Sequence, residues 1–151
     1  MMRKIRSGVF ETNSSAVHCL VVPKDLLAKS ELKIDRNGMI NVGFITEDTE
    51  YPLMTQYDKL SYLITQIYYK SGCYYRNEPM DNDYEFGIID EYISDYTGAN
   101  GIKIDYSNEP GINHQAVWNY DHDVDEFVEI YDKYAVLSFV FGPMMVREYM
   151  D

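Results

Sequence analysis

The sequence is poor in several kinds of residue, and each shortage argues against a class of protein. Only two of the 151 residues are cysteine, Cys19 and Cys73, and their separation does not match the spacing of a metal site. We therefore expect free thiols, with no disulfide framework, no metal and no cofactor. No apolar run approaches the roughly 18 residues that a membrane helix needs, so we expect no membrane span.

The first residues also lack the apolar core of a secretion signal. Residues 1–6 carry three basic side chains and are followed by Ser7, Gly8 and, soon after, Glu11. A signal peptide would continue into a stretch of about 7–15 apolar residues at this point. We expect the protein to stay in the cytoplasm of the cell that makes it.

Basic residues are the third shortage. The chain has 13 Lys and Arg against 25 Asp and Glu, a formal net charge of −12. Residues 1–76 hold 10 basic and 8 acidic side chains, whereas residues 77–151 hold 3 and 17. Such a surface repels nucleic-acid phosphate and attracts a basic protein groove, so direct nucleic-acid binding is not expected.

Two interpretations of the acidic half stay open. The charge could maintain solubility, or it could form an interface that imitates a nucleic-acid backbone. The second interpretation predicts an acidic interface made by Asp81, Asp83, Glu85, Asp90, Glu91 and Asp95.

Apolar residues, in contrast, are plentiful. They make up 46% of the chain, and 15% of the residues are aromatic. With no linker and no internal repeat, this composition predicts one domain over residues 1–151. Tyrosine is unusually frequent, with 15 residues that include the pairs Tyr68-Tyr69 and Tyr74-Tyr75. Most should be half-buried at the rim of the core, and a minority could form an aromatic contact patch.

Helical periodicity is clear in three segments. The first runs from Thr55 to Lys70 with Gly72 placed to end it, and the second from Asp81 to Tyr96 with Gly98 beyond its end. A third is predicted over residues 123–134 because Asp123 and Glu126 match a capping box, and a short helix could start at residues 23–27.

Strand patterns lie between these helices. Residues 16–22 are apolar on both alternating faces, which suits a central strand, and Asn37-Gly38 suits the turn of a hairpin. The other predicted strands are 32–34 and 39–44, which flank that turn, then 102–106 and 135–141. This order predicts an α+β domain, with a mainly antiparallel or mixed sheet and about three helices packed on it.

The segment from Glu11 to His18 holds the first candidate site. The side chains of Asn13, Ser14 and Ser15 can all bond nearby backbone groups, which is typical of a tight turn before a strand. They could equally present hydroxyls and amides to a ligand. His18 is then either a hydrogen-bonded core histidine or a catalytic one.

A second candidate lies in the loop between Gly111 and Trp118. Asn113, His114 and Gln115 are consecutive there, and loops often carry binding residues. If His18 and His114 converge, they would form a general acid and base suited to a phosphodiester.

The opening residues also resemble a known family. Phe10 to Ser15 and His18 match Phe-Glu-Thr-Asn-Ser-Ser-Ser-x-His, which follows a basic stretch in many small uncharacterised proteins of bacteriophages and prophages of low-GC bacteria; Ala16 replaces the third serine. Residues 58–63 and 111–115 look similar too, although Asn113 and Ala116 depart from the family's Asp-His-Gln-Ser. The resemblance implies a viral protein in the cytoplasm of a bacterial host, without implying an activity.

Three hypotheses follow. The first is a phage accessory protein that binds and inhibits a host protein with a basic groove, such as a CRISPR-type defence component. The second is a small hydrolase, phosphodiesterase or nucleotide-binding protein, and the third a virion-assembly protein. The second predicts that the first turn, the helix carrying Lys59 and the His114 loop meet, in a pocket that gathers Ser14, Ser15, His18, Lys59, His114 and Gln115.

Overall fold

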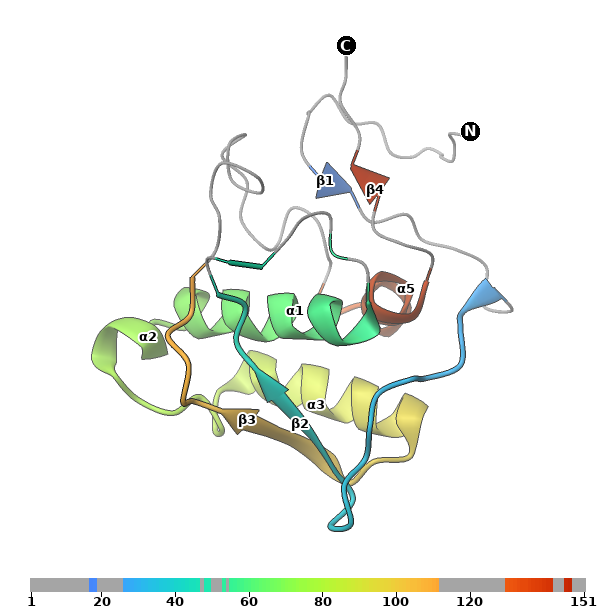
Figure 1. Cartoon of the computed structure of the whole chain (residues 1–151), viewed down its shortest axis with the longest axis horizontal. Coiled ribbons are helices and arrows are strands. Elements are labelled where there is room, and N and C mark those ends of the chain that lie inside the picture. Colours follow the sequence, from blue (N-terminus) through green and yellow to red (C-terminus); the bar gives the residue numbers. More distant parts are fainter. Residues whose placement is uncertain are drawn as a thin grey trace.

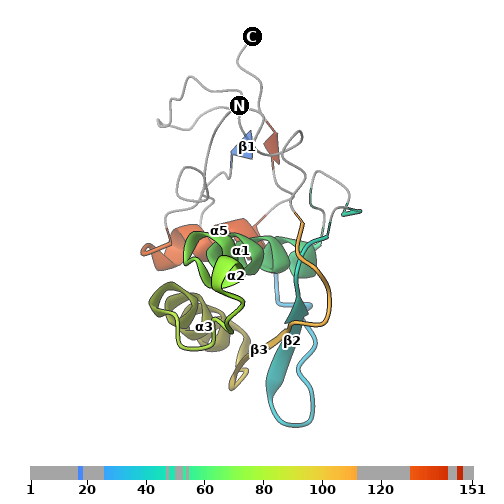
Figure 2. The ribbon, with the colours of Figure 1, turned by 90° about the vertical axis from the view of Figure 1, so that its left-hand side faces the viewer.

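The computed structural model describes residues 17–18, 26–46, 48–49, 53, 55–111, 130–142 and 146–147. Within them the chain has an α+β architecture, as predicted (Figure 1). The side view in Figure 2 shows α1 and α5 above α3, with the pair β2 and β3 packed along one side of the helices. The elements are β1 (Val17–His18), β2 (Met39–Gly43), α1 (Gln56–Lys70), α2 (Cys73–Arg76), α3 (Tyr84–Thr97), β3 (Gly101–Asp105), α5 (Lys133–Phe141) and β4 (Val146–Arg147).

The helix α1 is the centre of the core and confirms the first helix prediction. It begins after Thr55, whose hydroxyl accepts a hydrogen bond from the Asp58 backbone N–H at 3.0 Å. The chain turns away at Gly72, which has a φ of +84° that favours glycine. The predicted apolar stripe is buried: Leu60, Leu63, Ile64, Ile67 and Tyr68.

The helix α3 confirms the second helix prediction, with its start three residues later than Asp81. The carboxylate of Asp83 is the cap and accepts hydrogen bonds from the N–H groups of Glu85 and Phe86, at 3.0 and 3.1 Å. The helix ends at Gly98 in the left-handed conformation. Of the side chains predicted to point inward, Phe86, Ile89 and Ile93 are buried, and Tyr92 and Tyr96 are partly buried against the core.

The sheet corrects the predicted topology. The strands β2 and β3 pair in parallel, from Met39 opposite Gly101 to Gly43 opposite Asp105. The prediction of a mainly antiparallel or mixed sheet is therefore wrong for this pair; β1 and β4 form a separate antiparallel pair of two residues each. Parallel strands need a long crossover. Here residues 44–100 supply it, and they contain α1, α2 and α3.

The predicted hairpin is wrong, although its turn is present. Gly38 has a φ of +81°, and the Asp35 carboxylate accepts hydrogen bonds from the N–H groups of Asn37 and Met39. Residues 32–34, however, form no strand. An Asn-Gly turn reverses the chain, but it does not oblige the residues before it to pair with those after it.

The helix α5 replaces the strand predicted over residues 135–141. Asp132 begins it by accepting hydrogen bonds from the N–H groups of Tyr134 and Ala135. All residues from Val136 to Phe141 are buried, so the helix has no polar face from which its period could be read. Residues 130–132 are not helical, which corrects the end of the helix predicted over 123–134. Residues 123–129 and most of 16–25 lie outside the described part of the chain.

Candidate functional site

Three of the six carboxylates predicted to form an acidic interface support the backbone around α3. Asp83 caps the helix, as described above. Asp90 accepts hydrogen bonds from the Ile102 N–H at 2.9 Å and from the Ser94 hydroxyl at 3.3 Å, and so ties β3 to α3. Asp81 accepts a hydrogen bond from the Tyr106 hydroxyl. These carboxylates have internal functions that the sequence pattern did not reveal.

The other three make no bond to a backbone group among the described residues. Glu85 pairs with Lys70 at 3.1 Å and accepts a hydrogen bond from the Tyr131 hydroxyl at 2.8 Å. Asp95 pairs with Lys133, and both side chains are about half exposed. Glu91 is exposed and has no hydrogen-bond partner among the described residues.

The exposed side of α3 is nevertheless strongly acidic. Residues 77–111, all of them described, hold nine Asp and Glu against one base, Lys103. A shallow hollow of about 550 Å³ follows the helix, lined by Gly87, Asp90, Glu91, Ser94, Asp95, Gly98, Ala99 and Asn100. We call this hollow the acidic face.

Gly87 has no side chain, so the surface of the acidic face lies close to the helix backbone at this position. A Cβ placed on Gly87 would meet no atom within 4 Å, so packing does not require a glycine there. In the middle of a helix a glycine costs about 1 kcal/mol relative to alanine. Packing within the described part of the chain therefore gives no reason for this cost.

A second surface gathers the tyrosines at the corner between α1 and α2. Six aromatic rings form one continuous set of contacts, with neighbouring centroids 4.5 to 6.2 Å apart. Phe44 stacks on Tyr68 at 4.5 Å and lies 5.7 Å from Tyr106. Tyr74 lies 5.9 Å from Tyr68, 4.6 Å from Tyr69 and 5.0 Å from Tyr75. The paired tyrosines thus gather in one cluster of rings, and its function as a contact patch stays a prediction.

A pocket of about 410 Å³ opens at this corner. We call it the tyrosine pocket; its lining is Phe44, Tyr68, Tyr74, Tyr75, Asn77, Tyr106, Ser107, Asn108, Glu109 and Pro110. Glu109 is the one charged residue among them. Only the tyrosine pairs could be predicted as part of this pocket, because Phe44, Tyr106 and Glu109 come from segments far from them in the chain.

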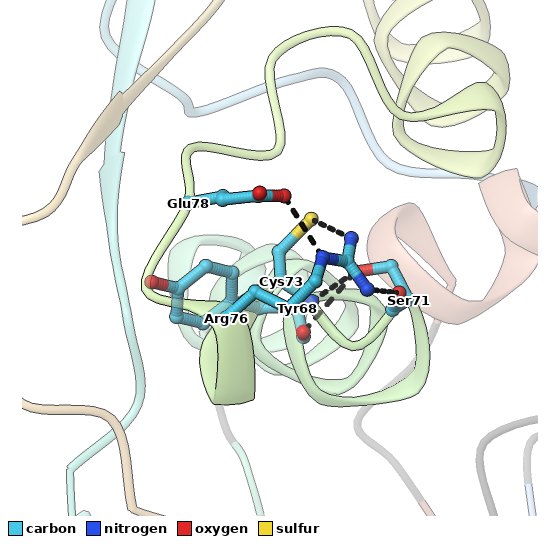
Figure 3. Close-up of polar contacts among 5 residues, drawn as sticks. All are labelled: Tyr68, Ser71, Cys73, Arg76 and Glu78. Atoms are coloured by element: carbon cyan, nitrogen blue, oxygen red, sulfur yellow. Dashed lines mark hydrogen bonds and ion pairs between the residues drawn. The ribbon is translucent and has the colours of Figure 1, made fainter.

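The corner is fixed by Arg76, as Figure 3 shows. Its guanidinium donates to the Glu78 carboxylate at 2.9 Å, to the Ser71 carbonyl at 3.3 Å and to the Cys73 sulfur at 3.7 Å. Asn77 then ends α2 in the left-handed conformation, which asparagine tolerates. These contacts join the end of α1 to the short helix α2 that carries Tyr74 and Tyr75.

Three phenols of the tyrosine pocket have a raised pKa. Burial and then the hydrogen bond to Asp81 raise the pKa of Tyr106 well above its usual range. The hydrogen bond to Glu109 raises the pKa of Tyr74, and burial raises that of Tyr68. The hydroxyls of Tyr74 and Tyr106 act as donors, to Glu109 and Asp81.

Lys59, predicted as a binding residue, is a buried lysine. Only 2% of its surface is exposed, and its ammonium donates to the Gly142 carbonyl at 3.3 Å, at the end of α5. It shares one side of α1 with Tyr62 and Gln66, which are also buried. Among its contacts, this bond to the end of α5 has a clear structural purpose, since a cation there also complements the helix dipole.

The two-histidine site stays a prediction. The backbone of His18 is in β1, opposite Val146, but its side chain is not described. Asn13, Ser14, Ser15, Asn113, His114 and Gln115 lie outside the described residues. The bond from Lys59 to Gly142 does place α1 within a few residues of β4, the partner of β1.

Among the described residues, every helix is too short or too polar to span a membrane. No group of three or more His, Cys, Asp or Glu side chains in the same residues is placed to hold a metal ion. In the comparisons with known proteins, no family model, curated protein or solved structure matches the chain.

Proposed function

We propose that the protein is a binding protein whose acidic face docks on a basic protein surface. The observation that carries the proposal is the nine-to-one excess of acidic over basic residues in residues 77–111. Fields of this kind attract an oppositely charged partner and speed its association. The partner we propose is a nucleic-acid-binding protein of a bacterial host, such as a CRISPR-type defence component, which the protein inhibits by occupying its basic groove.

The contacts of the carboxylates refine which residues a partner would meet. Glu91 and Asp95 lie one helical turn apart and are exposed, whereas Asp83 and Asp90 are occupied with backbone N–H groups. The low surface at Gly87 lies one turn before Glu91. We therefore propose Glu91 and Asp95 as the centre of the interface.

The test uses two double variants of equal net charge. Glu91→Gln with Asp95→Asn neutralises the acidic face, and Glu31→Gln with Asp48→Asn neutralises two exposed acids elsewhere. The wild-type chain is immobilised, a host lysate is passed over it, and any captured protein is purified. Its association rate with each variant is then measured by surface plasmon resonance at low and high salt.

We expect the association rate to fall about tenfold for the Glu91→Gln, Asp95→Asn variant and to change little for the Glu31→Gln, Asp48→Asn variant. High salt should lower the association rate of the wild type towards that of the first variant. DNA added as a competitor should release the captured protein. Equal rates for both pairs, or binding that is indifferent to salt, would contradict the proposal.

The alternative, a small hydrolase, phosphodiesterase or nucleotide-binding protein, has less support. Of its pocket residues only Lys59 has a described side chain, and the ammonium of that residue is buried against a helix end. We retain acidic-face binding as the proposed function because of the acidic excess over residues 77–111.

A further inference from the structure

We propose that the tyrosine pocket binds the guanidinium group of an arginine side chain. This proposal rests on the proposed function, because we take the arginine to belong to the same basic partner. The chemistry of the pocket itself is independent of the acidic face and is tested separately.

The walls of the pocket have the arrangement that an organic cation needs. The rings of Tyr74 and Tyr75 meet at 82°, and those of Tyr68 and Tyr74 at 75°, so neighbouring walls are nearly perpendicular. A cation within about 6 Å of a ring face is attracted by the quadrupole of the ring. Walls at right angles can turn two ring faces towards one cation, as adjacent sides of a box do, and the negative face of each ring then attracts it.

The charge of the lining selects a cation. Glu109 contributes a carboxylate, and the lining contains no lysine or arginine. One oxygen of Glu109, Oε2, accepts a hydrogen bond from the Tyr74 hydroxyl at 3.0 Å. The other, Oε1, has no partner among the described residues and remains able to accept from a ligand.

The internal arginine nearest in sequence does not occupy this site. Arg76 is committed to Glu78, Ser71 and Cys73, and it does not line the pocket. An arginine from another molecule would therefore find the pocket without a competing internal cation among the lining residues.

The pocket is open to solvent, and two of its wall rings are held by hydrogen bonds. Tyr75 is 75% exposed and Tyr106 38% exposed, so a side chain can enter between them. The Tyr106 hydroxyl accepts from the Met80 N–H at 2.9 Å, and the Tyr74 hydroxyl donates to Glu109 at 3.0 Å. Rings held in this way lose little freedom when a ligand binds.

Arginine suits these features better than lysine does. Its guanidinium is planar, stacks on aromatic faces and donates to a carboxylate at the same time, and it is less strongly hydrated than an ammonium. A lysine ammonium would have to give up a tighter hydration shell to enter between the rings. We therefore assign the pocket to guanidinium.

The experiment is an NMR titration of the full ¹⁵N-labelled chain. The probes are N-acetyl-arginine amide and N-acetyl-citrulline amide, which have the same shape but differ in charge, and N-acetyl-lysine amide. We expect arginine amide to cause saturable shifts in the amides of Tyr74, Tyr75 and residues 107–109, lysine amide to bind more weakly, and citrulline amide to cause no saturable shift.

Variants then locate the site. Glu109→Gln and Tyr75→Ala should each weaken arginine-amide binding about tenfold, the scale of one cation contact with a ring or carboxylate. Tyr75→Phe keeps the ring and should bind like the wild type. Tyr84→Ala is the matched control, because Tyr84 is 74% exposed but does not line the pocket.

Equal shifts with arginine and citrulline amides, tighter binding of lysine amide, or the same loss in the Tyr84→Ala variant would each overturn the assignment. The result is separable from that of the acidic face. Arginine-amide binding at the pocket together with a partner indifferent to Glu91 and Asp95 would uphold the pocket and reject the proposed function.

Discussion

Two glycines of one helix differ in what the fold requires of them. Gly98 ends α3 with a φ of +85°, in the region that side chains disfavour. Gly87 lies inside the helix, where a Cβ would have open space. A sequence shows both as glycine, and only the backbone conformation separates the necessary one from the dispensable one.

This difference gives a prediction with opposite signs at the two positions. Gly87→Ala should raise the free energy of unfolding by about 1 kcal/mol, because alanine favours the helix interior. Gly98→Ala should lower it by about 1 kcal/mol, because alanine is strained at positive φ. Urea denaturation of both variants and the wild type measures the two effects. A destabilised Gly87→Ala chain would show that the glycine has an internal function.

At the level of whole elements, Asp90 joins α3 to β3, and among the described residues no other side chain of α3 is hydrogen-bonded to that strand. Its carboxylate accepts a hydrogen bond from the N–H of Ile102, the second residue of β3, as a carbonyl of a neighbouring strand would. Asp95, one turn later, makes an exposed ion pair with Lys133 at the start of α5. Both residues link α3 to a neighbour, but only Asp90 satisfies a backbone group.

We therefore expect the two links to differ in strength. Asp90→Ala should lower the free energy of unfolding by about 1–3 kcal/mol, because the Ile102 N–H loses its partner. Asp95→Ala should lower it by less than about 1 kcal/mol, as exposed ion pairs do. Denaturation curves give the free energies, and hydrogen exchange at the Ile102 amide should quicken in the first variant alone. Equal losses would mean that Asp90 does not hold β3.

The elements also show how far the sequence could predict the fold. The helices α1 and α3 were predictable because each has a helical stripe, a capping side chain and a glycine beyond its end. The helix α5 was not, because burial of Val136 to Phe141 on every side removes the polar face that marks the helical period. The partner of β2 was missed because pairing with β3 depends on how the intervening helices pack, which no local pattern records.

The candidate sites, like the helices and strands, could be predicted only in part. An acidic surface over α3 was predictable from residue counts alone, but the functions of Asp83 and Asp90 within the fold were not. The tyrosine pairs signalled an aromatic patch, whereas Glu109 and Tyr106 join it only through the tertiary fold.

For the molecule as a whole, the net charge of −12 acts on stability as well as on binding. Self-repulsion among the carboxylates disfavours the compact state, and salt screens it, with a Debye length near 8 Å at physiological ionic strength. We expect sodium chloride, raised from about 0.01 to 0.3 M at pH 7, to raise the melting temperature by roughly 2–4 °C, which corresponds to about 1 kcal/mol at this size.

Repeating the melts near pH 4.5, the isoelectric point of the sequence, supplies the control. The net charge is close to zero there, so the effect of salt should shrink or vanish. A salt effect of the same size at both pH values would show that it arises from ion-specific effects and not from charge repulsion.

The parallel pairing of β2 with β3 sets an order of events during synthesis of the chain. Residues 39–43 leave the ribosome before their partner exists, and residues 44–100 must follow before Gly101 appears. At about 5–20 residues per second this interval lasts roughly 3–11 s. Helices form in microseconds, so α1 and α3 have time to fold first. During that interval the hydrogen-bonding edge of β2 is open to other nascent chains, and early packing of Ile40 and Val42 against α1 would be its main protection.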